Sequence, residues 1–149
     1  KAVILIDEAQ MLQSREIMEE LRGLLNLEVP GRKLVTFVLF GLPTLEQAMS
    51  QDEPLRQRIA VPYALGWLDR NTMADYIEYR MRVAGVSEQL FEKDALDLVY
   101  QYSRGIPRVV NTICNNCLLE GYLQKRRRIP GALVVAVCNS LHLDNRLAE

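Results

Sequence analysis

Two neighbouring carboxylates follow an apolar segment near the start of this 149-residue chain. Residues 2–6 are continuously apolar and rich in β-branched side chains, and Asp7 and Glu8 come directly after them. Such a run predicts a buried parallel strand, at whose carboxyl end an open α/β sheet binds its ligands. One carboxylate there can hold a magnesium ion between two phosphates, while its neighbour activates water. A strand that runs into an acidic helix cap has the same pattern, so the rest of the chain must distinguish a catalytic pair from an ordinary cap.

The cysteines offer a second kind of chemistry. Cys114 and Cys117 form a C-x-x-C, but they lie within a long helical pattern with no second pair, and His142 is far along the chain. Structural zinc normally takes four such ligands, so we interpret the cysteines as small core residues. Three cysteines, an odd number, predict reduced thiols in a cytosolic compartment rather than a disulfide framework.

Composition limits the classes of partner. The chain is 49% hydrophobic and 25% charged, with a formal net charge of −1, so it has no global field for nucleic acids or acidic membranes. The basic run at 125–128 predicts a solvated turn at a helix end, with contact to nucleic acid or acidic lipid as the alternative. No apolar run could span a bilayer, and no signal-peptide order is present. We therefore expect a cytoplasmic protein, or the cytoplasmic part of a membrane-associated one.

The first half of the chain alternates strand and helix patterns. After Gln10 the apolar residues recur at helical spacing, and Ser14 is the expected N-cap of a helix of about three turns. Residues 34–40 then form a second buried strand. Strand, helix and strand predict a parallel βαβ unit.

Beyond that unit the strand signals weaken. A short helix capped by Thr44 is expected over 44–50, followed by a third strand over 58–65 that Pro62 confines to a sheet edge. After Gly66 the patterns are helical, and they cover about 70–84, 92–103, 107–124 and 130–141. The predicted fold class is α/β, with a partial α/β core over 1–65 and an all-helical part over 66–149.

Five segments occur here in one order: ILIDEAQML, LRGLLNLE, KLVTFVLFGLPTL, LRQRIAVPYAL and GIPRVVNTICNNCLL. Together they resemble the ExeA-type ATPases, that is, general secretion pathway protein A and its relatives in the AAA superfamily of P-loop ATPases. The resemblance covers essentially the whole chain. It implies that residues 1–65 are the C-terminal part of an AAA ATPase core, from the Walker B strand to the last strand, and that 66–149 are its helical lid domain.

The resemblance also implies a role for each candidate site residue. Asp7 would hold magnesium, and Glu8 would be the catalytic base. Arg56 and Arg58 match the basic pair in which the family carries its arginine finger, which can act on a neighbouring subunit's nucleotide; Arg58 is preferred because it is nearer the strand. Arg108 matches sensor 2 of the lid, which reaches the nucleotide phosphates. The alternatives are solvated arginines on a loop and at a helix start.

Two features depart from the family pattern. Leu42 stands where the family commonly has a polar sensor-1 residue, with Thr44 as a weak substitute. No G-x-x-x-x-G-K-[ST] loop occurs in the sequence, so the chain is expected to begin partway through the core. ATP and Mg²⁺ are therefore expected cofactors of the intact protein and not of these 149 residues alone. The strand expected over 58–65 should then repack, for instance against the strand at 34–40, which corresponds to the family's fourth core strand. Alternatively, sheet edges should pair between chains.

The leading hypothesis is a fragment of an oligomeric ATPase, an ATP hydrolase that couples hydrolysis to assembly of a secretion or cell-envelope complex. Its expected partners are further copies of itself and secretion or envelope assembly proteins. A DNA-transaction ATPase of the transposition-helper type is the first alternative, and it would use residues 126–128 on DNA. A non-catalytic interaction module with a decayed site is the second, and Leu42 is consistent with it.

Overall fold

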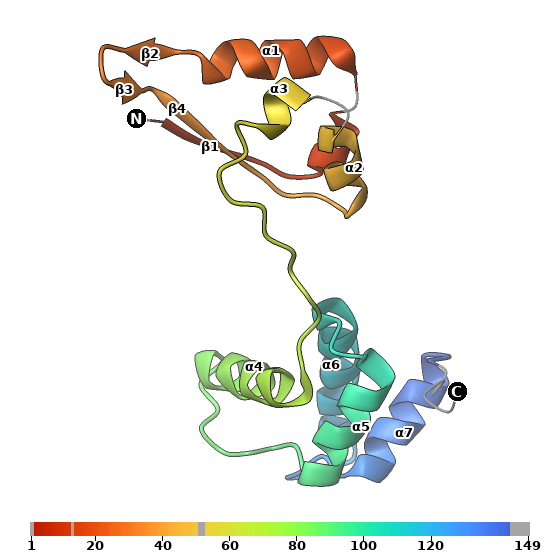
Figure 1. Cartoon of the computed structure of the whole chain (residues 1–149). Helices are drawn as coiled ribbons and strands as arrows, with labels where there is room; N and C mark the ends of the chain where they lie inside the picture. The colour runs from red at the N-terminus through yellow and green to blue at the C-terminus, as the bar shows by residue number, and fades with distance from the viewer. Residues whose placement is uncertain (1, 13, 51–52, 144–149) are drawn as a thin grey trace. The chain divides into compact units, whose positions relative to one another are not determined.

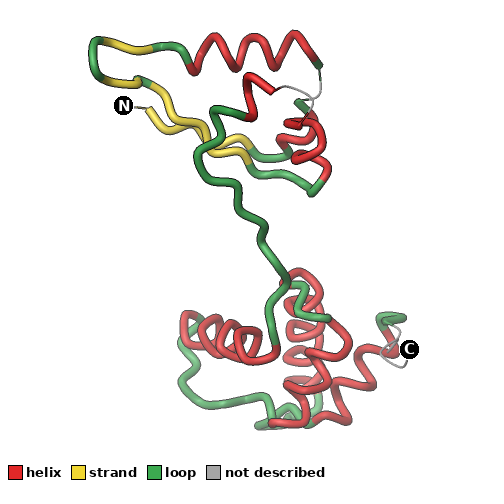
Figure 2. Tube along the Cα trace, in the orientation of Figure 1, coloured by secondary structure: helices red, strands yellow, loops and turns green. Residues whose placement is uncertain are grey.

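The computed structural model describes residues 2–12, 14–50 and 53–143 (Figure 1). The chain divides into two compact units, Lys1–Ala64 and Leu65–Glu149, and each is described by itself. The first unit combines strands with helices, and the second is built from helices (Figure 2). The α/β fold class, with a helical part after the sheet, is confirmed.

A parallel pair of strands forms the centre of the first unit. β1 (Ala2–Ile6) pairs with β4 (Val35–Leu39), and α1 (Arg15–Leu25) connects them. The helix begins where predicted, because the Ser14 Oγ accepts a hydrogen bond of 3.2 Å from the Ile17 N–H. The predicted βαβ unit and its N-cap are both confirmed.

A small hairpin between α1 and β4 was not predicted. β2 (Glu28–Val29) pairs antiparallel with β3 (Arg32–Lys33) across the turn at Pro30 and Gly31. Proline and glycine in this order suit the two central positions of a tight turn. Two-residue strands are too short to produce a period-two pattern, so the sequence does not indicate them.

Helices cover one face of the β1–β4 sheet. α2 (Thr44–Ser50) and α3 (Glu53–Arg56) join α1 in a small core. Its buried side chains are Met18, Leu21, Met49 and Leu55. Ile6 of β1 and the β4 residues Phe37 and Leu39 pack against them, so this face of the sheet is the inner one.

The expected burial of β1 on both faces is wrong. Val3 and Leu5 are 61% and 67% exposed. They point away from the Ile6 side because successive side chains of a strand alternate between its faces. In the part of the first unit that the structure describes, the buried core lies on the Ile6 side alone.

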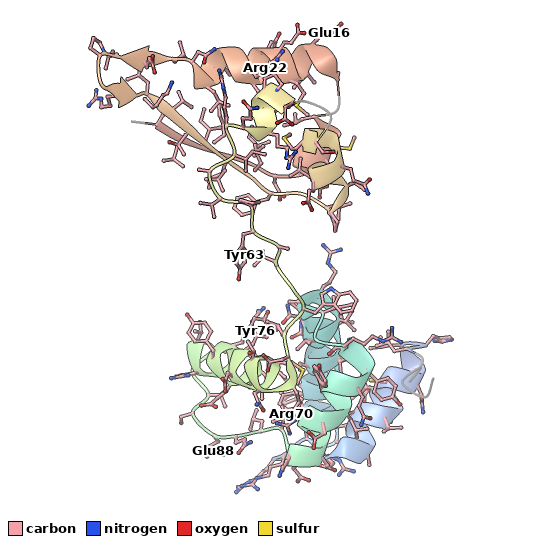
Figure 3. All side chains as sticks on the ribbon, in the orientation of Figure 1. Glu16, Arg22, Tyr63, Arg70, Tyr76 and Glu88 are labelled. Atoms are coloured by element: carbon pink, nitrogen blue, oxygen red, sulfur yellow. The ribbon has the colours of Figure 1, made fainter. Side chains whose placement is uncertain are left out.

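The predicted third strand over 58–65 is not formed. The chain is irregular over residues 59–68, and the apolar side chains from 59 to 67, including that of Val61, are exposed. The exposed Tyr63 is labelled in Figure 3. A strand needs ladder hydrogen bonds to a neighbour, and no described strand pairs with this segment, in which Pro62 lacks an N–H. Repacking against β4 is therefore also wrong, whereas pairing of sheet edges between chains stays a prediction.

The second unit contains the four predicted helices. They are α4 (Arg70–Val83), α5 (Lys93–Ser103), α6 (Pro107–Leu123) and α7 (Gly131–Ser140). Their core includes the fully buried side chains of Met73, Val99, Val110, Ile113 and Val134. No helix among the described residues of the chain is long and apolar enough to cross a membrane.

Polar contacts fix the helices of this unit to one another. The Arg70 Nε of α4 donates a hydrogen bond of 2.6 Å to the Asp97 Oδ1 of α5 (Figure 3). The Asp94 Oδ2 of α5 accepts a bond of 3.1 Å from the Gly131 N–H, the first N–H of α7. Because that N–H has no partner within its own helix, Asp94 satisfies a group that would otherwise be unpaired.

The three cysteines belong to the core of the second unit. Cys114, Cys117 and Cys138 are free and buried, as interpreted from the sequence. Burial raises the pKa of Cys114 and Cys117 to about 12 and that of Cys138 to about 11. These thiols stay protonated near neutral pH and are poor nucleophiles.

The buried thiols predict a loss of stability at alkaline pH. An exposed thiol ionises near pH 8.5, so the folded pKa is raised above the unfolded one. The associated stability is complete below about pH 8.5 and is lost as the pH rises toward the folded pKa, by about 1.4 kcal/mol per pH unit for each thiol. We expect the Tm from circular dichroism to fall between pH 8.5 and 10.5, and to fall less in Cys117→Ala. An identical pH dependence in the variant would contradict this.

Candidate functional site

Asp7 and Glu8 lie in the bend that follows the carboxyl end of β1. A short 3-10 helix, η1 (Ala9–Met11), begins directly after them. Both carboxylates are exposed, and the Asp7 Oδ1 accepts a hydrogen bond of 2.8 Å from the Glu8 N–H. This bond fixes one oxygen of the Asp7 carboxylate, and the second oxygen is not used by it. The sheet edge thus presents two carboxylates where a ligand can approach them.

Glu8 adopts a left-handed backbone conformation, with φ 53° and ψ 34°. This conformation costs a residue other than glycine about 1–3 kcal/mol, and it occurs at functional sites where the surroundings fix the backbone. Here the end of β4 fixes it. The Phe40 N–H donates to the Ile6 carbonyl, and the Ala9 N–H donates to the Phe40 carbonyl, each at 2.8 Å.

Gln10 was not identified as a site residue from the sequence. Its side chain is buried, with 7% exposed. The Gln10 Nε2 donates to the Glu8 Oε2, and its Oε1 accepts a hydrogen bond of 3.0 Å from the Leu42 N–H. Gln10 therefore joins the candidate base to the loop after β4. A polar side chain within an otherwise apolar segment two positions after Glu8 is the signal that could have identified it.

The loop after β4 contains the sensor-1 position. Leu42 is 60% exposed, and its backbone N–H rather than its side chain contacts the site, through Gln10. Thr44 is the first residue of α2 and is exposed. The link between this loop and Glu8 is thus made by a backbone group of Leu42 and the Gln10 amide.

The two candidate arginine-finger residues lie at the end of α3. The Arg56 Nη1 is 3.5 Å from the Glu53 Oε2, in an exposed ion pair. The Arg58 Nη1 donates a hydrogen bond of 3.3 Å to the carbonyl of Arg22 on α1. Both side chains are exposed, and no hydrogen bond or ion pair of the described residues joins either of them to Asp7 or Glu8.

Arg108 lies in the second unit, in the first turn of α6. Pro107 occupies the start of that helix, as predicted from the sequence. The Arg108 side chain is exposed, and its carbonyl accepts a hydrogen bond of 3.1 Å from the Thr112 Oγ1. The predicted position at a helix start is confirmed, while the sensor-2 role stays a prediction.

The donor set at the end of β1 fits a magnesium ion shared with a nucleotide. Mg²⁺ usually binds through one or two carboxylates together with phosphate oxygens and water, rather than in a closed protein cage. Asp7 and Glu8 supply exposed carboxylate oxygens at one point. The described residues contain no cluster of three or more metal-ligating side chains, so a complete set of protein ligands is not assembled among them.

Comparisons with known sequences identify relatives for most of the chain. Residues 1–49 match the family model described as AAA domain. General secretion pathway protein A of Aeromonas hydrophila is 37% identical over 131 residues, which make up 87% of this chain and 24% of that protein. The chain therefore spans about a quarter of the length of this relative.

Solved structures share the fold. The RuvB Holliday junction branch migration motor of Thermotoga maritima matches with a TM-score of 0.78 at 20% identity, over 96% of this chain and 45% of that chain. A point mutant of the same motor matches with a TM-score of 0.76 at 21% identity, over 96% of this chain and 46% of that chain. At this identity the likeness is one of fold alone. The sequence relatives support one assignment: the AAA superfamily of P-loop ATPases and, within it, the group of general secretion pathway protein A.

Proposed function

We propose that this chain supplies the Walker B half of an ATP-hydrolysing site. The observation that carries the proposal is the Asp7–Glu8 pair at the carboxyl end of β1, where Glu8 has a left-handed backbone and a carboxylate bonded to Gln10. Arg104 and Lys125 have the same left-handed backbone in turns after helices, so it is the position of the pair after β1 and the bond to Gln10 that support the proposal. The phosphate-binding loop must come from residues outside the 149, because the sequence contains no G-x-x-x-x-G-K-[ST].

The residues divide the work of hydrolysis between them. Asp7 would hold a magnesium ion, which when bound would supply positive charge to the nucleotide phosphates. Glu8 orients the attacking water and accepts its proton. Arg58, with Arg56 as the second choice, stabilises charge on the nucleotide of a neighbouring subunit, and Arg108 couples the helical lid to the phosphates.

At the level of the cell, we propose that an oligomer containing this chain uses ATP hydrolysis to assemble a secretion or cell-envelope complex. The support is the 37% identity to a protein of the general secretion pathway. The site works from the cytoplasmic side, where ATP is available. Replacing Glu8 with Gln in the host's gene is expected to block secretion while the protein is still made, whereas normal secretion would argue against this role.

An arginine finger that acts between subunits is testable by mixing variants. The test protein is these 149 residues joined to a phosphate-binding loop. Glu8→Gln subunits keep the finger but lack the base, whereas Arg58→Ala subunits keep the base but lack the finger. We expect each variant alone to lose most ATP hydrolysis, by about 10³-fold or more for the finger, and their mixture to regain a measurable fraction.

The matched control for this experiment is Arg56→Ala, the neighbouring arginine that pairs with Glu53. Mixing it with Glu8→Gln should give no gain beyond the activity of Arg56→Ala itself. If the Arg58→Ala mixture is as inactive as its components, Arg58 does not act between subunits. If Arg56→Ala gives the complementation instead, the finger is Arg56.

A DNA-transaction ATPase is a second candidate, favoured by the basic turn after α6. Its four cations at 125–128 are exposed, and no carboxylate of the described residues pairs with them. If all four contact DNA phosphates, the logarithm of the binding constant should fall with the logarithm of salt concentration with a slope of about −3.6. A slope near zero, or one unchanged in a variant with serine at 126–128, would exclude this turn as a DNA contact.

A further inference from the structure

We infer that Gln10 is a positioning residue of the site, which fixes the direction of the Glu8 carboxylate and ties it to the loop after β4. The inference rests on the proposed ATPase function and goes beyond it, because it assigns a role to a side chain outside the Walker B carboxylates. Gln10 does not contact the reacting atoms. It acts through Glu8.

The two ends of the Gln10 amide make different bonds. Its NH₂ donates to the Glu8 carboxylate, and its carbonyl oxygen accepts from the Leu42 N–H. Only a side chain that carries one donor and one acceptor satisfies both partners, and glutamine has this pair at the required reach. A glutamate at position 10 would accept from Leu42 but repel Glu8. A leucine would leave both partners without their bond.

The loop after β4 lies directly against this amide. A Cβ added at Gly41 would be 2.7 Å from the Gln10 Oε1 and 3.2 Å from the Gln10 backbone N, closer than ordinary contact. The absence of a side chain at Gly41 therefore allows the loop to approach. Because the fit is tight and Gln10 is buried, a shift of this loop must move the amide, and with it the Glu8 carboxylate.

This arrangement explains how the site functions with leucine at the sensor-1 position. Leu42 has no polar side-chain atom to contact water or phosphate, but its N–H reaches Glu8 through Gln10. One carboxylate oxygen, Oε2, is held by the Gln10 amide, so the other oxygen of Glu8 is the one left to accept a proton from water. Gln10 thus supplies the connection between the end of β4 and the base.

The test uses the protein formed by these 149 residues and a phosphate-binding loop. Gln10→Leu is expected to lower kcat for ATP hydrolysis by about 10- to 100-fold, with KM for ATP changed less than about twofold. Gln10→Glu, which is nearly isosteric and keeps the bond to Leu42, should lower kcat to a similar extent. The control is Gln47→Leu, an exposed glutamine of α2 that should leave kcat unchanged.

A double-mutant cycle separates positioning from a merely structural role. If Gln10 acts through Glu8, adding Gln10→Leu to Glu8→Gln should cause no further loss of hydrolysis. A structural role predicts additive losses and a higher KM instead, which would overturn the inference. Circular dichroism of Gln10→Glu checks that the fold is retained.

The outcomes distinguish the inference from the function on which it rests. Without Mg²⁺-dependent hydrolysis by the unsubstituted protein, the proposed function fails and the role of Gln10 fails with it. Hydrolysis that is normal in both Gln10→Leu and Gln10→Glu but lost in Glu8→Gln would leave the function standing and overturn the role of Gln10 alone.

Discussion

In the protein that joins these 149 residues to a phosphate-binding loop, replacing Glu8 with glutamine is expected to lower ATP hydrolysis by about 10²- to 10⁴-fold while ATP binding stays nearly unchanged. Glutamine is nearly isosteric, and its carbonyl oxygen can still accept the bond from the Gln10 Nε2. The amide cannot accept a proton from water, so the loss falls on the chemical step. The rate of phosphate release at saturating ATP measures kcat, and titration with a fluorescent ATP analogue measures the affinity for nucleotide.

The matched control for this substitution is Glu16→Gln, which changes an exposed glutamate in the first turn of α1. It removes the same charge from the same unit but should leave both hydrolysis and binding unchanged. If Glu8→Gln retained more than about a tenth of the activity, Glu8 would not be the general base, since base catalysis typically contributes at least 10²-fold.

Replacing Gly105 with alanine is expected to destabilise the helical unit by roughly 2–6 kcal/mol, a large part of a domain's total stability. Gly105 has φ +73°, and an added Cβ would lie 1.8 Å from the Leu68 carbonyl oxygen. Two costs therefore combine. One is the left-handed backbone, and the other is displacement of the segment at Leu68, whose N–H donates a bond of 3.0 Å to the Gly105 carbonyl.

Gly85→Ala provides the control, because this glycine also has a positive φ, +87°, but no atom lies within 4 Å of an added Cβ. The free energy of unfolding of this variant should fall only by the cost of the left-handed backbone, about 1–3 kcal/mol. Urea unfolding of both variants measures the difference. Equal losses would mean that the close approach to Leu68 contributes nothing, and that the start of α6, where Arg108 lies, is not fixed by this contact.

The sequence predicted those elements whose signals are local. Two helices illustrate this. The first has its N-cap, Ser14, and the second has a proline in its first turn, Pro107, each directly before residues with helical apolar spacing. The segment at 58–65 has a less regular strand pattern and forms no strand, because a strand depends on a partner elsewhere in the chain. The hairpin around Pro30 was missed because two residues cannot display a period.

In the candidate site, too, features with a local sequence signal could be predicted and features that depend on distant residues could not. Asp7 and Glu8 could be identified because they are adjacent in sequence and directly follow an apolar strand. Gln10 stands out only as a polar residue in an apolar segment, and its role could not be predicted because it depends on the Leu42 N–H, 32 positions along the chain. The left-handed conformation of Glu8 was equally hidden, because it is held by the backbone at the end of β4 and not by its neighbours in sequence.

The most direct test of the proposed site is the rate of ATP hydrolysis by these 149 residues alone and by the same residues joined to a phosphate-binding loop, each with and without Mg²⁺. We expect turnover only in the joined protein, only with Mg²⁺, and not after Glu8→Gln. Mg²⁺-dependent turnover by the 149 residues alone, or full turnover in the Glu8→Gln variant of the joined protein, would contradict this expectation.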